Sequence, residues 1–576
     1  MLVRDELNDQ QREAVELVGE PSLIVAGPGT GKTKTLTARI AHLITSGAAK
    51  PGEILALTFT NKAAEEMRSR VAASVDGEVP TITTFHALCY QLLGGDMQFI
   101  SSAERTMLIK SLRKSAELKS LTTNELALEI SRLKNQTVDT EDKALDALRR
   151  AYDAALEERG LCDFDDLLLK TRELLKTEKP ELPYNYILVD EFQDTNTLQY
   201  ELLQLIRNND NVCVIGDPLQ SIYGFRGADS TMFDRFAADF PDLKKVYLSV
   251  NYRSVPEVVR LTNEIFPDSP KLTAHTEMSG KVTAIEVLNE YSEAARIIDT
   301  IEKSIGGSSF LKSHEMEYDQ HEAGHTFRDF AVLCRTHHVG KTVQKLLGES
   351  GIPFQVVGEG SFYERPAIWA TIQLMRYFIN PSVMLESLPA LKNFSAIQIK
   401  VLLEKIDGTQ NVSDLAVTIM DTFGLDQADR SQFISGLVRF DEQRLAAYVQ
   451  YVDELMATEF YDPSADAVTL TTIHAAKGLE FTHVFLIGAE EGVLSHKNAD
   501  LEEERRLFYV AVSRAKKQLD ILRARTRASK PTELSRFVRN IDNTILPRAL
   551  DENIEAQKRR IAKRTAKRSQ GSLFDF

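Results

Sequence analysis

Short apolar runs of strand length alternate with helical stretches through the first half of the chain. Four runs bounded by turn residues predict β-strands, at residues 23–25, 54–57, 187–189 and 212–215. The segments between them have the spacing of amphipathic helices. Strands that alternate with helices are typical of a parallel sheet covered on both faces. We therefore predict an α/β domain in this half.

A second set of apolar runs predicts a second α/β domain. These runs lie at residues 282–285, 330–333, 354–357, 468–470 and 484–488. Two other regions, about residues 100–160 and 382–465, are rich in Ala, Leu, Glu, Lys and Arg with helical periodicity. We interpret both as helical insertions.

These patterns divide the chain into five parts. The last part, from residue 551, loses its periodicity and carries the cationic runs 558–560, 563–564 and 567–568, so we expect a disordered basic tail. The expected parts are a first α/β domain at 1–99 and 161–252, its insertion at 100–160, a second α/β domain at 253–381 and 466–550, its shortened insertion at 382–465, and the tail at 551–576.

Composition narrows the class of protein without deciding its ligand. The chain has 576 residues, 43% hydrophobic and 27% charged, as in ordinary globular proteins of several domains. The apolar runs are far shorter than the ~20 residues that span a bilayer, and the N-terminal segment has no signal-peptide pattern. Four well-separated cysteines favour a reducing, cytoplasmic compartment. The net charge of −15 neither supports nor excludes nucleic acid.

A glycine-rich loop between a strand and a helix predicts a phosphate-binding site. Glycines allow backbone N–H groups to turn toward phosphates, the lysine reaches the β and γ oxygens, and the threonine hydroxyl holds Mg²⁺. The first position is alanine where the strict pattern has glycine. The alternative is a chance glycine-rich turn. The residues of this loop are Ala26, Gly27, Pro28, Gly29, Thr30, Gly31, Lys32 and Thr33.

Two carboxylates follow the predicted strand at 187–189. Asp190 is placed to bind the Mg²⁺ shell, and Glu191 to orient or deprotonate the attacking water. A surface Asp-Glu pair is common by itself. Combined with the glycine-rich loop and an apolar strand, this pair indicates hydrolysis of ATP or GTP.

Residues 189–196, Val-Asp-Glu-Phe-Gln-Asp-Thr-Asn, resemble the second motif of the UvrD/Rep/PcrA helicases of superfamily one. Residues 7–15 resemble the Q motif of that family, in which the glutamine matching Gln11 reads adenine, and this implies ATP over GTP. The resemblance spans residues 7 to about 525 and implies two RecA-like P-loop domains. Other segments resemble family motifs in chain order: 57–64, 83–86, 162–168, 215–229, 251–254, 362–365, 471–481 and 502–515.

The resemblance implies roles for residues of both domains. Tyr252 is expected to stack on adenine and Glu480 to approach the ribose, with Arg39 also assigned to the nucleotide site. Arg253 and Arg514 are expected to meet the γ-phosphate from the second domain, and Gln220 to sense it. Planar guanidinium groups suit phosphate oxygens, and an arginine delivered across a cleft acts only when the cleft is closed. Taken alone, such arginines are more often surface residues.

The resemblance also implies a track for single-stranded DNA. Flat rings allow stacking on bases of any sequence, whereas polar side chains hold phosphates. One position departs from the family, since a phenylalanine, residue 225, stands where tryptophan is usual and offers less stacking area. An aromatic in a strand-end loop is otherwise more often a half-buried core residue. The expected DNA contacts are Phe59, Thr60, Asn61, Phe85, His86, Tyr223, Phe225, Arg226 and His474.

These features predict a 3′-to-5′ ATP-dependent DNA helicase of repair or replication, with the polarity implied by resemblance alone. A close alternative is a single-strand translocase that strips proteins or feeds a separate nuclease. An alternative of another class is a nucleotide-switched scaffold on a sliding clamp. The intact Lys32, Asp190, Glu191 and Arg514 argue against the scaffold.

Two segments depart from the family pattern. Only about 85 residues separate positions 380–381 from the fifth motif, roughly half of what the family implies, and a Gly-Ile-Gly element that contacts duplex is missing. His314, His321 and His325 invite a metal interpretation, but their spacing matches no zinc pattern, so a solvated loop is preferred.

The C-terminus resembles a peptide that binds a sliding clamp. Gln570, Leu573 and Phe576 would be the anchors in the archaeal and eukaryotic form, and Gln570, Leu573 and Phe574 in the bacterial form. Aromatics at the tip of a basic, disordered tail have no core in which to be buried. The alternative is a chance apolar tail end.

Overall fold

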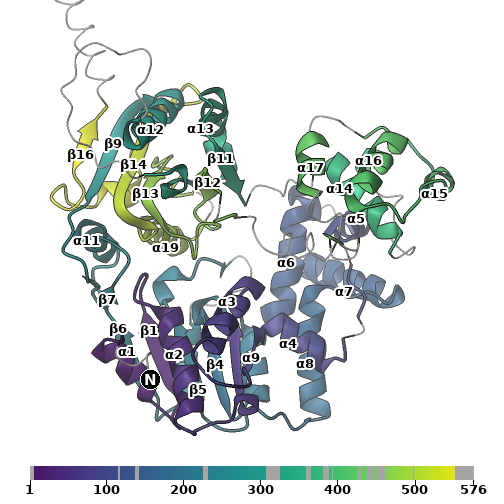
Figure 1. Cartoon of the computed structure of the whole chain (residues 1–576), viewed down its shortest axis with the longest axis horizontal. Helices are drawn as coiled ribbons and strands as arrows, with labels where there is room; N and C mark the ends of the chain where they lie inside the picture. The colour runs from purple at the N-terminus through teal and green to yellow at the C-terminus, as the bar shows by residue number, and fades with distance from the viewer. Residues whose placement is uncertain are drawn as a thin grey trace, which may run out of the picture.

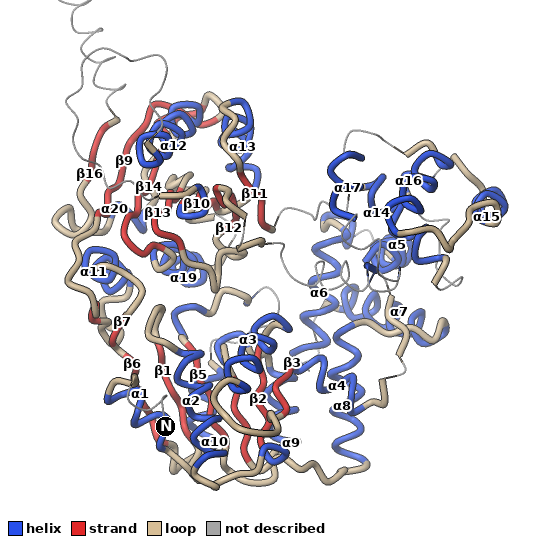
Figure 2. The backbone as a smooth tube through the Cα atoms, in the orientation of Figure 1, coloured by secondary structure: helices blue, strands red, loops and turns tan. Residues whose placement is uncertain are grey.

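The computed structural model describes most of the chain. The described residues are 6–95, 97–100, 102–113, 117–136, 140, 142–224, 231–306, 325–358, 365–379, 388–391, 393–425, 430–437, 445, 448–449, 461–463, 465–496 and 499–551. Two sheets with helices on their faces lie one above the other in Figure 1, and helices of two insertions lie to their right. Figure 2 shows the same division, with the strands gathered in two groups.

The first domain is built on a six-stranded sheet in which every pairing is parallel. Its central strands are apolar at almost every position because both faces are covered, as expected for a parallel sheet. In spatial order the strands are β3 (Thr81–Thr84), β2 (Ile54–Thr58), β4 (Tyr186–Val189), β5 (Val212–Gly216), β1 (Ser22–Ala26) and β6 (Lys244–Leu248).

Helices cover both faces of this sheet and form two hydrophobic cores. One core contains Leu36 and Met67, and the other contains Leu167 and Phe192. The helices of this domain are α1 (Asp9–Glu16), α2 (Lys32–Thr45), α3 (Asn61–Ala72), α4 (Phe85–Leu92), α8 (Phe164–Thr177), α9 (Thr197–Ile206) and α10 (Met232–Asp239).

The order of the strands places three functional segments side by side. Strands β4, β5 and β1 are neighbours and run in the same direction, so their carboxyl ends meet at one edge. Asp190 follows β4, Asp217 follows β5, and the glycine-rich loop follows β1. Ligands of open α/β sheets bind at this edge.

The second domain contains an eight-stranded sheet that is parallel except for a short antiparallel pair of β14 with β15. Along its path the strands are β11 (Phe354–Val357), β12 (Val468–Thr472), β10 (Phe330–Cys334), β13 (Phe481–Leu486), β14 (Ala515–Arg527), β9 (Lys281–Asn289) and β16 (Arg548–Leu550), with β15 (Lys530–Pro531) beside β14. Its helices are α11 (Pro256–Ile265), α12 (Glu290–Ile305), α13 (His337–Glu349), α19 (Leu501–Val512) and α20 (Arg536–Arg539). A small parallel pair, β7 (Val250–Asn251) with β8 (Thr273–Ala274), flanks α11 in sequence.

Each insertion has a hydrophobic core of its own. The first contains α5 (Ser102–Leu112), α6 (Thr123–Gln136) and α7 (Lys143–Glu158). The second contains α15 (Ala396–Leu403), α16 (Val412–Phe423) and α17 (Arg430–Leu437). Helix α14 (Pro366–Tyr377), which we predict in the second domain, packs in the core of this second insertion. Buried Lys134 of α6 joins the first insertion to α8, because its ammonium lies 2.9 Å from Asp163 and 2.7 Å from Asp166. The insertion is therefore held by charge as well as by apolar packing.

The predicted α/β fold with two parallel sheets is confirmed, although the apolar runs did not reveal all of its strands. Strands β3, β6, β14, β15 and β16 were not predicted, since each is short or mixes polar and apolar residues. Among the described residues, the helices are all too short or too polar to cross a membrane.

Candidate active site and nucleic-acid track

The glycine-rich loop wraps between the end of β1 and the start of α2. Gly29 and Gly31 have φ angles of +71° and +82°, which side chains other than glycine rarely adopt. A Cβ at Gly31 would lie 2.8 Å from the Gln11 amide nitrogen, and one at Gly29 would lie 2.7 Å from the Arg253 Cβ. Glycine is therefore required at both positions, and the loop keeps its N–H groups open to a phosphate.

Gln11 lies against this loop. Its buried side-chain amide donates a hydrogen bond to the Thr30 carbonyl oxygen at 3.0 Å. Asn8 begins α1 with a reciprocal capping box to Gln11, which fixes the start of the helix. Recognition of a base by Gln11 would therefore be linked to the shape of the phosphate loop.

Tyr252 stands beside the same loop. Its backbone N–H donates to the Gly29 carbonyl at 2.8 Å, and the neighbouring Asn251 amide donates to the Pro28 carbonyl at 2.7 Å. The Tyr252 hydroxyl accepts from Asn8 at 2.7 Å, while the residue remains 42% exposed. An accessible ring next to the phosphate loop is suited to stacking on a nucleobase.

The guanidinium of Arg39 is buried and donates to the Ala14 carbonyl of α1. It thus holds α1, and with it Gln11, against α2. The predicted contact of Arg39 with nucleotide stays a prediction.

The carboxylates after β4 are held in a strained turn. Glu191 has a φ of +50°, in the left-handed region that is costly for a residue with a side chain. The backbone N–H of Glu191 donates to the Asp190 carboxylate at 2.9 Å. The side-chain amide of Gln193 donates to the Glu191 carboxylate. These bonds turn the two carboxylates to separate positions at the edge of the sheet.

Burial and charge give the two carboxylates opposite acidities. Burial, together with the charge of Glu191, raises the pKa of Asp190 to about 7. Burial also opposes ionisation of Glu191, but the ammonium groups of Lys32 and Lys477 outweigh it and lower the pKa of Glu191. The two neighbouring carboxylates therefore lose their protons over different ranges of pH.

The site fits Mg²⁺ bound together with a phosphate ligand. Asp190 and the Thr33 hydroxyl are the protein groups at the strand and loop ends that would hold it. Within the described ranges, no cluster of three or more His, Cys, Asp or Glu residues is suited to a metal.

Arg514 enters this site from the second domain. It is 1% exposed and donates to the carbonyls of Val510 at 3.0 Å and Leu479 at 3.1 Å, and to the Gln220 side chain at 3.3 Å. Gln220 in turn donates to Asp217 at 2.7 Å. Burial and the nearby Arg253 lower the pKa of Arg514 to about 9, so it remains a cation near neutral pH. The predicted sensor and arginine thus meet across the domain boundary.

Lys477 makes a second contact between the domains that we did not assign from the sequence. Its ammonium lies 2.6 Å from the Asp194 carboxylate and 2.8 Å from the Gln220 carbonyl oxygen. Burial raises the pKa of Asp194 to about 6, against the opposing effect of Lys477. Both residues lie within the motif segments quoted above. Their opposite charges, with no role assigned to either, were the only feature of the sequence that could have suggested this contact.

Arg253 and Glu480 contact each other. The Arg253 Nε donates to the Glu480 carboxylate at 2.6 Å, and Lys516 lies 2.8 Å from the other oxygen of that carboxylate. Burial opposes ionisation of Glu480, but Arg253 and Lys516 lower its pKa. The two residues therefore neutralise each other's charge in this structure.

Phe59 and Tyr223 form a stacked pair, with ring centroids 5.6 Å apart and planes inclined by 13°. The Lys477 ammonium lies 4.9 Å from the centre of the Tyr223 ring, and the Tyr223 hydroxyl donates to the His474 carbonyl at 3.4 Å. Phe59 is 39% exposed. This pair brings together predicted track residues from separate segments.

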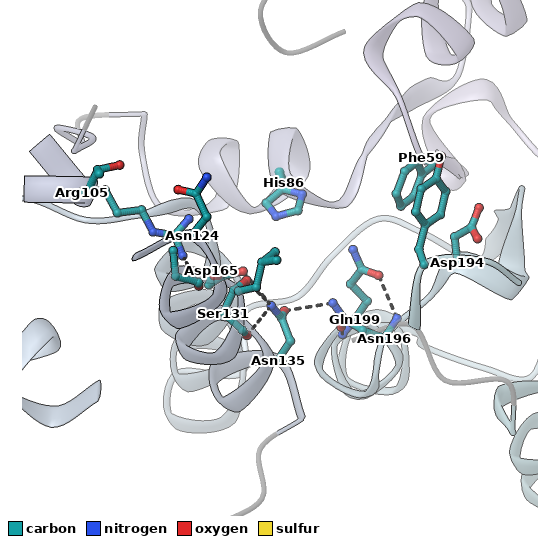
Figure 3. A pocket seen from close by; sticks show the side chains of 14 residues that line it. Phe59, His86, Arg105, Asn124, Ser131, Asn135, Asp165, Asp194, Asn196 and Gln199 are labelled. Carbon is teal, nitrogen blue, oxygen red and sulfur yellow. Dashed lines mark hydrogen bonds between the residues drawn. The ribbon is translucent and has the colours of Figure 1, made fainter. Parts of the chain in front are cut away.

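A cavity of about 590 Å³ adjoins this pair (Figure 3). Asn196, at the start of α9, donates to Asn135 at 2.9 Å, and Asn135 donates to Asp165 at 2.7 Å across its floor. Its walls come from the first domain, the first insertion and the loop that carries Tyr223. The lining residues are Phe59, His86, Arg105, Thr106, Asn124, Ala127, Leu128, Ser131, Asn135, Asp165, Asp194, Asn196, Gln199 and Tyr223.

Other predicted track residues have structural roles. Phe85 is 6% exposed and belongs to the core of the first domain, so its ring is not open to a base. Thr60 caps α3 by accepting from the Ala63 N–H at 3.1 Å, and Asn61 accepts from Thr84 at 3.4 Å.

Several predicted residues lie outside the described residues: Phe225, Arg226, His314, His321, Gln570, Leu573, Phe574 and Phe576. His325 is described, and its ring lies 3.7 Å from the Asp329 carboxylate. The four cysteines are all buried free thiols.

Comparison with known proteins agrees with this geometry. The model of the UvrD/REP helicase N-terminal domain matches residues 7–241, and that of the UvrD-like helicase C-terminal domain matches residues 246–459 and 452–526. The ATP-dependent DNA helicase PcrA of Staphylococcus epidermidis is 31% identical over 651 aligned positions, covering 94% of this chain and 87% of the relative. PcrA of Bacillus subtilis is 30% identical, covering 96% and 87%. UvrD1 of Mycobacterium tuberculosis is 29% identical, covering 94% and 86%.

The family models together cover most of the chain, and they include the segments that form the phosphate loop, the carboxylate turn and the contacts of Arg514 and Lys477. The chain therefore belongs to the UvrD/REP helicase family.

Proposed function

We propose that the protein is an ATP-dependent DNA helicase that moves 3′-to-5′ along single-stranded DNA and unwinds duplex, in DNA repair or replication. The observation that carries this proposal is the position of Lys477. Its ammonium donates to the carbonyl oxygen of Gln220, the predicted γ-phosphate sensor, at 2.8 Å, and lies over the Tyr223 ring on the track side. A single side chain of the second domain thus touches both sites of the first.

The residues of the cleft suit in-line attack of water on a terminal phosphate. The Glu191 carboxylate, ionised because its pKa is lowered, would orient the water and accept its proton. Lys32 and Arg514 would supply positive charge to the phosphate oxygens, from one domain each. Mg²⁺, held by Thr33 and Asp190, would neutralise phosphate charge when bound. Turnover would therefore require the second domain to be closed on the first.

Alternating closure and opening of this cleft would move the track residues along the DNA strand. Rings such as Phe59 and Tyr223 bind bases without reading their sequence, so the strand can advance past them. Changes in the cleft would reach these rings through Lys477 and Gln220, which lie between the two sites. Translocation along one strand follows from repeated closing and opening.

Strand displacement tests this function most broadly. The protein would be incubated with ATP, Mg²⁺ and duplexes that carry a 3′ tail, a 5′ tail or a fork. We expect unwinding of the 3′-tailed and forked duplexes and none of the 5′-tailed duplex. Unwinding that requires a 5′ tail would contradict the polarity. Glu191→Gln, which keeps the shape of the side chain but not its charge, is the matched inactive control.

A second candidate function is that of a translocase that strips proteins or feeds a separate nuclease. The short stretch between residue 381 and the fifth motif favours it, because the family element that contacts duplex is missing there. Release of streptavidin from a biotinylated 3′ or 5′ strand end, without unwinding of any tailed duplex, would establish this alternative. A sliding-clamp scaffold with little turnover is disfavoured by the shared catalytic cleft. We place the enzyme in the cytoplasm with the nucleoid.

We also propose that the C-terminal peptide binds a sliding clamp through Gln570, Leu573 and either Phe574 or Phe576. Its support is the sequence alone: two aromatics end a cationic segment that has few other apolar residues. Removal of residues 570–576 should abolish co-elution with the clamp of the source organism while ATP turnover is unchanged. Separate substitutions of Phe574 and Phe576 by Ala would choose between the two docking modes.

A further inference from the structure

Residues 272–275, which follow α11, lie beside the nucleotide site. They contain strand β8, which pairs in parallel with β7. Tyr252 follows β7 and His275 follows β8, so the pairing of the strands places these two residues next to each other. The His275 backbone N–H donates to the Asn251 carbonyl oxygen at 2.8 Å and continues the pairing. In Figure 1, β7 lies between α11 of the second domain and α1 of the first.

This segment is held from both sides. The side chain of Asn263, on α11, donates to the Leu272 carbonyl oxygen at 2.9 Å and accepts from the Leu272 N–H at 2.9 Å. The Leu272 side chain in turn lies on the phosphate loop, because a Cβ at Gly27 would be 2.7 Å from one of its methyl carbons. The segment therefore joins α11 to the loop that surrounds the phosphates.

The imidazole of His275 packs against the ring of Tyr252. The ring centroids are 4.6 Å apart and the planes are inclined by 42°. Two rings cannot approach this closely edge to edge, so they overlap in part. His275 is exposed and Tyr252 is 42% exposed, so the contact lies at the surface and leaves part of the tyrosine ring open.

The other contacts of Tyr252 leave its ring free to turn. Its backbone is held by the Gly29 carbonyl, and its hydroxyl is held by Asn8. Both contacts lie at the ends of the long axis of the side chain, and rotation of a tyrosine ring about this axis is soft. A flat neighbour on the ring opposes that rotation. His275 is therefore the contact that sets the plane of the ring, and stacking on a base depends on this plane.

We propose that His275 is a positioning residue of the nucleobase site, which holds the Tyr252 ring in the plane on which the base of ATP stacks. The inference rests on the proposed stacking of a base on Tyr252 and extends that site to a residue after α11. It predicts an effect on the base alone, because His275 contacts the tyrosine ring and the phosphate loop is held by other residues of the segment.

The test separates the base of the nucleotide from its phosphates. ATP turnover would be measured at saturating single-stranded DNA, with ribose 5-triphosphate, which is ATP without its base, as a competitive inhibitor. His275→Ala should raise the KM for ATP about 2- to 10-fold, the effect of one lost aromatic contact, with kcat unchanged. The inhibition constant of ribose 5-triphosphate should stay at its wild-type value.

Matched variants separate the contact between the rings from a general disturbance. His275→Phe keeps a flat ring on Tyr252 and should keep the KM for ATP near that of wild type. His338→Ala removes an exposed histidine of α13 and should change neither constant. An equal weakening of ATP and ribose 5-triphosphate by His275→Ala would overturn the proposal, because it would show that the whole site is distorted.

Tyr252→Ala distinguishes failure of this inference from failure of the site on which it rests. It should raise the KM for ATP more than His275→Ala does, and adding His275→Ala should have no further effect, because the histidine acts through the tyrosine. If Tyr252→Ala raises the KM but His275→Ala does not, or if the two effects add, the positioning role is wrong. If Tyr252→Ala leaves the KM unchanged, the base site on Tyr252 is wrong, and the role of His275 with it.

Discussion

The nucleotide cleft buries its charges, whereas the strand track exposes its rings. Arg514 and Asp194 are almost completely buried and are held by hydrogen bonds from both domains. Phe59 is exposed and is held by stacking on the Tyr223 ring. The two surfaces are adjacent, because the side chain of Lys477 contacts both of them.

This difference indicates how each surface responds to change. Removing one partner of a buried ion pair leaves an uncompensated charge in a medium of low dielectric constant, so the cleft should fail abruptly. Removing one exposed ring leaves its neighbours in place, so the track should weaken by increments. The predictions below test this contrast, from the largest effect to the smallest.

Lys32→Ala should reduce DNA-stimulated ATP turnover by about 10³-fold or more, because the lysine supplies charge to the phosphates and has no part in the track. Affinity for single-stranded DNA should be unchanged. Lys34→Ala, which removes an exposed lysine of the same helix turn that pairs with Glu6, is the matched control. If Lys32→Ala keeps more than about a tenth of wild-type turnover, the glycine-rich loop is not part of the catalytic site.

Lys477→Ala should reduce DNA-stimulated turnover by at least about 10-fold, since breaking a buried pair costs ~3–5 kcal/mol and this pair joins the domains. Lys345→Ala, an exposed lysine of α13, is the control. Adding Asp194→Asn to Lys477→Ala should cost less than the sum of the two single effects, because both substitutions break the same contact. Strict additivity would show that the two residues act separately.

Tyr223→Ala should weaken single-strand affinity by ~1–3 kcal/mol, with little dependence on base sequence. Basal turnover should persist, because the ring lies outside the cleft. Equilibrium binding to oligothymidylate and oligodeoxyadenylate would measure both statements. An unchanged affinity would show that the Tyr223 ring packs against Lys477 and does not bind DNA.

His86 should make no charge-dependent contribution to DNA binding between pH 6 and pH 8. Burial lowers the pKa of His86 to about 4, so its ring stays neutral in this range. Affinities of wild type and His86→Gln should therefore change with pH in parallel. Tighter binding by wild type alone at pH 6 would show that His86 is a cation in the complex.

The same shift predicts a loss of stability in acid. The folded pKa of His86 lies below its unfolded value near 6.5, so the neutral ring contributes stability above pH 6.5, and this contribution is lost as pH falls toward 4. The contribution is up to ~3 kcal/mol. Thermal melts at pH 7 and pH 4.5 should differ less for His86→Gln than for wild type.

The sequence predicted the central strands better than the edges and the mixed strands. Strands such as β2 and β5 are buried on both faces and read as continuous apolar runs. Edge strand β6 alternates exposed and buried positions, and β14 carries Arg523, Arg525 and Arg527, which pair with buried or half-buried glutamates. Such strands carry no apolar run, and only the partner strands reveal them.

The site was predictable where its residues follow strands within recognisable segments. Lys32, Asp190 and Glu191 could be assigned in this way, because parallel strands end at a common edge. Lys477 with Asp194 could not, since this contact joins residues far apart in the chain. Phe85 shows the converse: a segment can match while an individual side chain points into the protein.

The central claim is that ATP turnover needs charge from both domains, while the hold on DNA does not. ATP turnover of Arg514→Lys, measured across a range of single-strand concentrations, tests it most directly. Lysine keeps the charge but cannot reproduce the guanidinium contacts to Gln220 and the carbonyls. The account predicts that maximal turnover falls by roughly 100-fold or more while the half-saturating DNA concentration stays the same. Near-normal turnover, or a parallel loss of DNA affinity, would contradict it.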